Sequence, residues 1–104
     1  MKVLTFETLV CKAIRTRVVV EFDYDGLHRV VHPYCHGTTR KGQDSLRAVQ
    51  IAGESRSGAL GYGKLWTFSK IRNLLLTEEN FTADDPEYNP DDEALVRIHC
   101  RIEK

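Results

Sequence analysis

Residues 17–34, with the sequence RVVVEFDYDGLHRVVHPY, decide the fold. The first half, residues 17–24, is rich in β-branched and aromatic residues, which favour a β-strand. This half runs into Asp25-Gly26, a pair that is preferred in two-residue type I′ hairpin turns, and the chain then returns over residues 27–34. The stretch therefore predicts two antiparallel strands joined by a tight turn.

The turn also predicts which side chains face each other across the hairpin. With the turn centred on Asp25-Gly26, Tyr24 lies opposite Leu27. Two positions further along, Phe22 lies opposite Arg29. Because successive side chains of a strand point to opposite faces, one face then carries Val18, Val20, Phe22, Tyr24 and Val31.

A helix is predicted before the hairpin, at residues 5–15. Apolar side chains recur there with the spacing of one helical face, at Phe6, Leu9, Val10, Ala13 and Ile14. Thr5 is expected to cap the first turn. After the hairpin, Pro33 is expected to end regular strand pairing, and residues 37–42 are expected to form a loop.

The rest of the chain alternates between short strands and loops. Residues 52–63 are rich in glycine and predict a loop. Residues 78–93 are acidic and contain Pro86 and Pro90, so they are expected to form an ordered excursion over the surface. Further strands are predicted at residues 45–51, 64–68, 71–77 and 94–103, the last from its alternating apolar and polar side chains.

One helix followed by five or six short strands in 104 residues predicts a single, mainly β domain of the α+β class. This pattern is typical of a small β-barrel, closed or half closed, with the helix over an open end or edge. The barrel is expected to span residues 17–77, before the acidic excursion and the final strand. Hydrophobic residues make up 41% of the chain, which is enough for one core.

Charge, cysteines and hydropathy restrict the class of protein. The chain has 15 basic and 15 acidic residues, which argues against gripping duplex DNA through bulk positive charge. Its three cysteines, Cys11, Cys35 and Cys100, are odd in number and lack CxxC spacing, so reduced thiols are expected. The apolar runs are too short for a secretory leader or a membrane span. These features predict a cytoplasmic protein with no membrane association and no cofactor.

Residues 29–50 form the candidate binding region, because they collect four basic residues, two histidines and a tyrosine around two glycines. Arginine offers a planar fork of donors that suits phosphate, and an aromatic ring offers a stacking face for a base. The candidate ligand-binding residues in this stretch are Tyr34, His36, Arg40 and Arg47. In the alternative interpretation, Arg40 and Lys41 are a solvated loop tip and Arg47 pairs with a carboxylate.

Several short motifs follow one another in a set order. They comprise Ala13 and Ile14, then Tyr24, Gly26, Arg29, Val31 and Pro33, and later Trp66, Phe68, Lys70, Ile71 and Leu74. In this order they resemble the WYL domains of bacterial regulators. The stand-alone, single-domain members are resembled above all, through Leu46-Arg47-Ala48 with Gln50, the glycine- and serine-rich residues 53–58, and Tyr88-Asn89-Pro90-Asp91. The motif that names the family departs from the pattern, since Leu46 and Ala48 match it but Asp44-Ser45 replaces the Trp-Tyr pair.

The resemblance implies an SH3-like or Sm-like barrel that acts as a non-enzymatic ligand sensor. In that family a nucleotide or single-stranded nucleic acid is thought to bind the domain, and most members also carry a DNA-binding winged helix-turn-helix. This chain has no room for such a helix-turn-helix, so a partner protein that carries the DNA-binding domain is expected. Lys70 matches a pocket position at which the family has arginine, and it joins the candidate ligand-binding residues.

Three features have other interpretations that stay open. Arg29 matches a family arginine, but its stem can equally pack over the hairpin. Trp66 suits a stacking platform for a base, although core packing is the more common role of such a residue. Strand edges such as residues 95–103 favour an alternative function, in which the chain forms a homodimer or docks onto another protein.

Histidines and cysteines leave a metal site and an enzyme to be weighed. The residues available to a zinc site are His32, Cys35, His36, His99 and Cys100. Strand alternation puts His99 and Cys100 on opposite faces, which argues against zinc. Cys35 and His36 also point apart if they lie on a strand, so a thiol nucleophile is disfavoured and no enzyme activity is expected.

Overall fold

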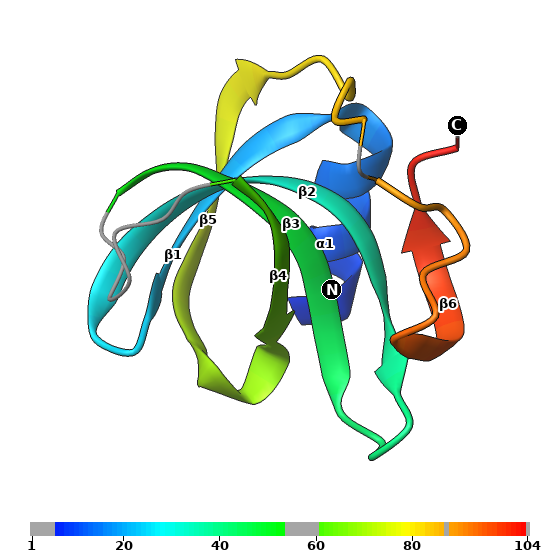
Figure 1. The fold of residues 1–104 in the computed structure, drawn as a ribbon. Helices are drawn as coiled ribbons and strands as arrows, with labels where there is room; N and C mark the ends of the chain where they lie inside the picture. The colour runs from blue at the N-terminus through cyan, green and yellow to red at the C-terminus, as the bar shows by residue number, and fades with distance from the viewer. Residues whose placement is uncertain (1–5, 54–60, 87, 104) are drawn as a thin grey trace, which may run out of the picture.

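The computed structural model describes residues 6–53, 61–86 and 88–103, which form one α-helix and six β-strands (Figure 1). In chain order the elements are α1 (Phe6–Thr16), β1 (Val18–Tyr24), β2 (Leu27–Thr39), β3 (Asp44–Gly53), β4 (Gly61–Thr67), the 3₁₀ helix η1 (Phe68–Lys70), β5 (Ile71–Asn80) and β6 (Leu95–Arg101). This mainly β architecture with an N-terminal helix confirms the predicted class. No helix among the described residues is long and apolar enough to cross a membrane.

The six strands form one antiparallel sheet with the order β4-β3-β2-β1-β5. β6 lies off this path and pairs with the C-terminal half of β2, beyond the residues that β1 reaches. The sheet is strongly curved, and α1 packs against β2 and β6 (Figure 1). Among the described strands, β4 and β5 at the two ends of the order do not pair, so the barrel is not closed.

The β1–β2 hairpin has the register that its turn predicts. Phe22 pairs with Arg29, as expected from a turn centred on Asp25-Gly26. Asp25 and Gly26 have φ angles of 55° and 74°, the left-handed conformation that a type I′ turn requires at both central positions. Phe22 is fully buried, so the face predicted from the alternation is the one that meets the core.

The helix contributes the other side of this core. Val10, Ala13 and Ile14 of α1 are all buried, as the helical spacing predicts. Their partners include Phe22, Val31, Leu46, Trp66 and Ile71 from the sheet. The predicted cap, Thr5, lies outside the described residues.

β2 is longer than predicted, because Pro33 does not end it. The strand continues to Thr39, and Pro33 pairs with Ala48 of β3 beside an irregularity in the ladder. Such a bulge tolerates proline because one residue there lacks a ladder hydrogen bond. The predicted loop at residues 37–42 is therefore wrong in extent, and the connection shrinks to residues 40–43.

Gly37 belongs to β2, at a point where β2 and β6 come close together. It pairs with Ser45 of β3 on one side and with Ile98 of β6 on the other. A Cβ atom at this position would collide with the carbonyl oxygen of Arg97. The glycine therefore permits the close approach of two strands rather than a loop conformation.

The final strand is shorter than predicted, and a bulge breaks its alternation. Leu95 and Arg97 pair with adjacent residues of β2, so that Val96 is the extra residue. As a result Leu95 is buried while Val96 is 61% exposed, which reverses the predicted faces at this end of β6. Further along the strand, Cys100 is buried as the pattern predicts.

Cys11 of α1 and Cys100 of β6 form a disulfide, so the prediction of reduced thiols is wrong for this pair. Their Cα atoms lie 5.8 Å apart although 89 positions separate them in the sequence. Cysteine spacing does not indicate this pairing, because α1 and β6 become neighbours only in the folded sheet. Cys35 is a buried free thiol, as predicted.

The acidic excursion starts later than predicted, because β5 continues to Asn80. Phe81 and Tyr88 anchor it, since both side chains are buried. The Tyr88 hydroxyl donates a hydrogen bond of 2.7 Å to the carbonyl oxygen of Ile102. The excursion is therefore attached to the domain by Phe81 at its start and by Tyr88 near its middle.

Candidate functional site

The predicted ligand-binding residues lie in different parts of the molecule. Tyr34 is a core residue that is 1% exposed and packs its ring against those of Phe81 and Tyr88. Arg40 is exposed in the connection between β2 and β3, whereas Lys70 is exposed at the end of η1. These three residues therefore do not line a common pocket.

Arg47 pairs with a carboxylate, as its alternative interpretation predicts. Its Nε and one terminal nitrogen donate to the two carboxylate oxygens of Asp92, at 2.6 and 3.2 Å. Burial opposes ionisation of Asp92, but the hydrogen bonds from Arg47 and from the Ala94 N–H outweigh it and lower the Asp92 pKa. This bidentate pair holds the acidic excursion against β3.

His36 is fully buried in β2. Its ring makes edge contacts with the rings of Phe68, at 4.4 Å, and His99, at 4.9 Å between centroids. Among the residues that the structure describes, neither ring nitrogen of His36 finds a hydrogen-bond partner. Burial, followed by the neighbouring His99, lowers the His36 pKa to about 4, so the imidazole is neutral near pH 7.

A second group of basic and aromatic residues comes together on β1 to β4. We call it the Arg29–Lys64 cluster, and it consists of Tyr24, Arg29, Gln50, Lys64 and Trp66. The Arg29 guanidinium lies 5.4 Å from the Trp66 ring centre, and the Lys64 ammonium lies 5.3 Å from it. Both cations donate to the same Gln50 side-chain oxygen, each at 3.3 Å.

Arg29 is the buried centre of this cluster, being 3% exposed. It also donates to the carbonyl oxygen of Tyr24 at 3.2 and 3.4 Å, and it lies 6.0 Å from the Tyr24 ring centre. The residues that the structure describes offer Arg29 no carboxylate partner. Burial and the positive charge of Arg29 lower the pKa of Lys64, which is only partly exposed.

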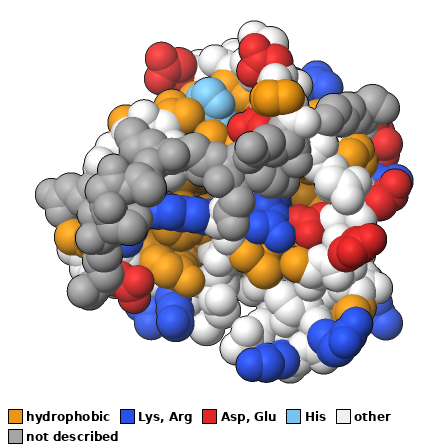
Figure 2. Space-filling model, in the orientation of Figure 1, with side chains coloured by type: hydrophobic (Ala, Val, Ile, Leu, Met, Phe, Trp, Pro, Cys, Tyr) orange, Lys and Arg blue, Asp and Glu red, His pale blue; other side chains and the backbone are white. Residues whose placement is uncertain are grey.

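The surface around this part of the molecule is mixed in chemistry. Figure 2 shows Lys and Arg side chains beside hydrophobic ones in the middle of one face, with acidic side chains gathered mainly along its upper and right-hand margins.

Gln50 and Lys64 were not among the predicted site residues. Pairing of β3 with β4 brings them together, and the sequence hides that register because the glycine-rich residues 52–63 predict a loop, whereas β3 extends to Gly53 and β4 begins at Gly61.

A third group of residues joins the helix to three strands. One ligand atom from each of His36, Asp44 and His99 lies within 4.8 Å of those from the other two. Thr38 lies between two of them, since its hydroxyl donates to Asp44 at 3.0 Å and is 2.8 Å from His99 Nε2. The hydrogen bond with Asp44, together with burial, raises the pKa of Glu7 on α1.

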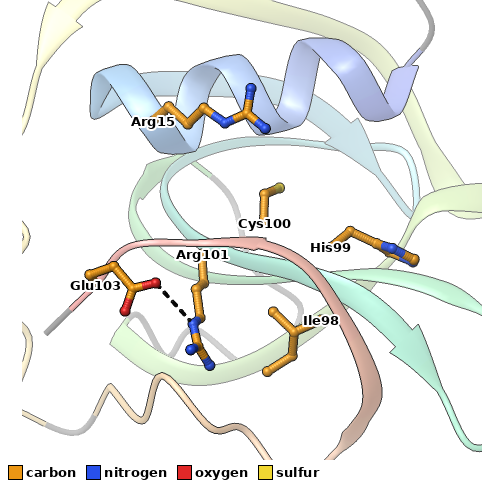
Figure 3. Close-up of a pocket in the computed structure, with 6 residues that line it drawn as sticks. All are labelled: Arg15, Ile98, His99, Cys100, Arg101 and Glu103. Atoms are coloured by element: carbon orange, nitrogen blue, oxygen red, sulfur yellow. Dashed lines mark hydrogen bonds and ion pairs between the residues drawn. The ribbon is translucent and has the colours of Figure 1, made fainter.

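Two hollows lie beside this third group, between α1 and β6. They share Arg15 and His99 in their linings and have volumes of about 390 and 250 Å³. Figure 3 shows the Cys100 sulfur pointing from β6 toward α1, whereas Arg101 extends away from the helix and pairs with Glu103. The smaller hollow is bordered by His36 and His99 on one side and by residues of α1 on the other, and His36 itself stays buried.

The structure rearranges the residues weighed for metal binding and catalysis. His32 stacks on Phe81 at 4.3 Å, and Cys100 is held in the disulfide. Burial, with Asp92 nearby, raises the pKa of the Cys35 thiol to about 11, so it carries no thiolate near pH 7. Of the residues considered from the sequence, His36 and His99 are the pair that the fold brings together.

Comparisons of the chain with protein-family models, with curated proteins and with solved structures find no match. Its resemblance to WYL domains therefore stays a prediction from the sequence motifs.

Proposed function

We propose that the chain is a non-enzymatic module that binds a nucleotide or single-stranded nucleic acid at the Arg29–Lys64 cluster. The observation that carries this proposal is that Arg29 and Lys64 lie over the ring of the same tryptophan, Trp66, at 5.4 and 5.3 Å. Cations attract phosphate, and the Trp66 ring, which is only 2% exposed, holds the two cations rather than stacking on a base. The curved sheet with a flanking helix supports assignment to the SH3-like or Sm-like barrels, in their WYL form.

The electrostatics of the cluster favour an anionic ligand. Arg29 and Lys64 share one amide oxygen, and their mutual repulsion opposes the protonation of Lys64. A phosphate group would place negative charge beside both cations and would accept hydrogen bonds from them. Lys64 reaches the surface and therefore contacts the ligand directly. Arg29 is buried beneath it, where it orients Gln50 and adds positive charge to the binding site.

The fluorescence of Trp66, the only tryptophan of the chain, offers a direct test. Mononucleotides and single-stranded oligonucleotides should quench or shift it saturably at low salt, with an affinity that falls as salt is raised. Lys64→Gln should weaken binding by at least about tenfold and flatten the salt dependence, whereas the exposed helix variant Lys12→Gln should change neither. Absence of saturable binding at low salt, or equal behaviour of the two variants, would refute the proposal.

The bound state would then be read by a partner protein that carries a DNA-binding domain in the cytoplasm.

A different function, assembly through strand edges, is favoured by one specific observation. Leu75 of β5 and Val96 of β6 are 57% and 61% exposed, so each of these strands presents a large aliphatic side chain that a partner strand could cover. Molar mass measured over a wide range of concentration separates these functions, since a constant monomer mass excludes a homodimer.

A further inference from the structure

We propose that His36, Asp44 and His99 bind a divalent transition metal ion, with zinc as the expected ion. The three residues come from β2, from the start of β3 and from β6. Two imidazoles and one carboxylate form a ligand set that zinc and its neighbours in the transition series prefer, whereas magnesium and calcium prefer oxygen ligands. This site is separate from the Arg29–Lys64 cluster and does not depend on the proposed function.

The ligand atoms of His36, Asp44 and His99 lie close together, but somewhat farther apart than they would around a bound ion. The ligand atoms lie within 4.8 Å of one another, and His99 Nε2 is 4.0 Å from Asp44 Oδ1. Zinc bonds of about 2.0–2.2 Å would bring tetrahedral ligands to roughly 3.3–3.5 Å from one another. Rotation of the Asp44 and His99 side chains, both more than a third exposed, can provide this contraction.

The state of His36 points to a ligand independently of the cluster geometry. Its side chain is fully buried, and both ring nitrogens lack a hydrogen-bond partner in the described part of the chain, residues 6–53, 61–86 and 88–103. A buried polar group in this state is costly, and structures rarely leave one without a partner unless it serves another role. A metal ion held between His36 and His99 would satisfy one nitrogen of the buried ring.

The surroundings supply the remaining parts of a coordination site. Glu7 of α1 already contacts Asp44 and borders the smaller hollow with His36 and His99, so a shift of its exposed side chain would bring its carboxylate to the ion as a fourth ligand. Thr38, which now bridges Asp44 and His99, would become an outer partner that orients their ligand atoms. A metal bound here would join α1 to the three strands β2, β3 and β6.

Isothermal titration of tag-free protein with Zn²⁺, without thiol reductant, tests the site. We expect one ion per chain, and Co²⁺ should give the visible absorption of a four-coordinate site, while Mg²⁺ should not compete. His99→Gln and Asp44→Asn should each weaken Zn²⁺ binding by at least about tenfold, since even outer partners of a metal contribute that much. Both positions are partly exposed, so these variants are expected to fold.

The matched control is His28→Gln. His28 is also exposed on a strand and contacts two carboxylates, those of Glu21 and Asp23, but it lies in the β1–β2 hairpin. This variant should bind Zn²⁺ as the unaltered protein does. Failure to bind Zn²⁺, binding that survives both His99→Gln and Asp44→Asn, or a loss caused by His28→Gln would each overturn the proposal.

Discussion

Removal of the Cys11–Cys100 disulfide should lower the free energy of unfolding by about 4.6 kcal/mol. The bond closes a loop across 89 positions of the sequence. In the chain-entropy description, a loop of this length removes about 15 cal/mol/K from the unfolded chain, which is about 4.6 kcal/mol at 25 °C. A typical domain is stable by only about 5–15 kcal/mol, so the reduced protein should unfold about 20–30 °C lower.

Urea unfolding with and without a reductant measures this loss, with Trp66 fluorescence as the signal. The double variant Cys11→Ala/Cys100→Ala should have the same free energy of unfolding as the reduced protein, apart from a small packing loss. Reductant should not change its stability. Cys35→Ala is the control, because it removes a buried thiol but keeps the disulfide and its sensitivity to reductant. A difference below about 1 kcal/mol between the oxidised and reduced protein would refute the entropic reasoning. Detection of three reactive thiols in the protein unfolded without reductant would also refute it, because the disulfide leaves only Cys35 as a free thiol.

Three other perturbations test single contacts. Arg47→Met should cost about 3 kcal/mol because it leaves the Asp92 carboxylate buried without its guanidinium, and adding Asp92→Leu should recover part of the loss in urea unfolding. Between pH 6.5 and pH 4, stability measured in chelator should fall by about 3 kcal/mol more in the unaltered protein than in His36→Gln, because burial lowers the His36 pKa to about 4 and the unfolded chain therefore takes up the proton first. Burial also lowers the His32 pKa, so a fall of the same sign remains in both proteins. Gly37→Ala should lower the free energy of unfolding by about 2–3 kcal/mol, because its Cβ atom would force β6 away from β2. The control Gly26→Ala meets no neighbour within 4 Å and should cost about 1 kcal/mol, because its backbone is left-handed. Equal losses for the two variants in thermal unfolding would contradict the close-approach argument.

Local features of the fold could be predicted from the sequence because short segments determine them. The hairpin register follows from Asp25-Gly26 alone, since a two-residue turn fixes every pair of the adjoining ladder. The helix follows from side-chain spacing within 11 residues. Each of these predictions needs no knowledge of what lies elsewhere in the chain.

Features that depend on distant segments could not be predicted in the same way. The bulges at Pro33 and Val96 appear only when β2 meets its partners, and the periodicity of a single strand does not contain them. The disulfide and the His36–His99 contact both result from the pairing of β6 with β2. Four of the five predicted binding residues lie in one basic stretch, residues 29–50, whereas Lys64 joins Arg29 only through the β2–β3 and β3–β4 pairings.

The place of β6 beside β2 also has a consequence for how the chain folds. Strands β1, β2 and β3 each pair with the next strand along the chain, but the β1–β5 and β2–β6 ladders join distant residues, as in Val18 with Asn80 and Cys35 with Arg101. Loop-closure entropy delays such contacts, so the consecutive hairpins should form first and β6 should dock late. An unfolded chain that keeps its disulfide already holds β6 near α1, and it should refold faster than the reduced chain.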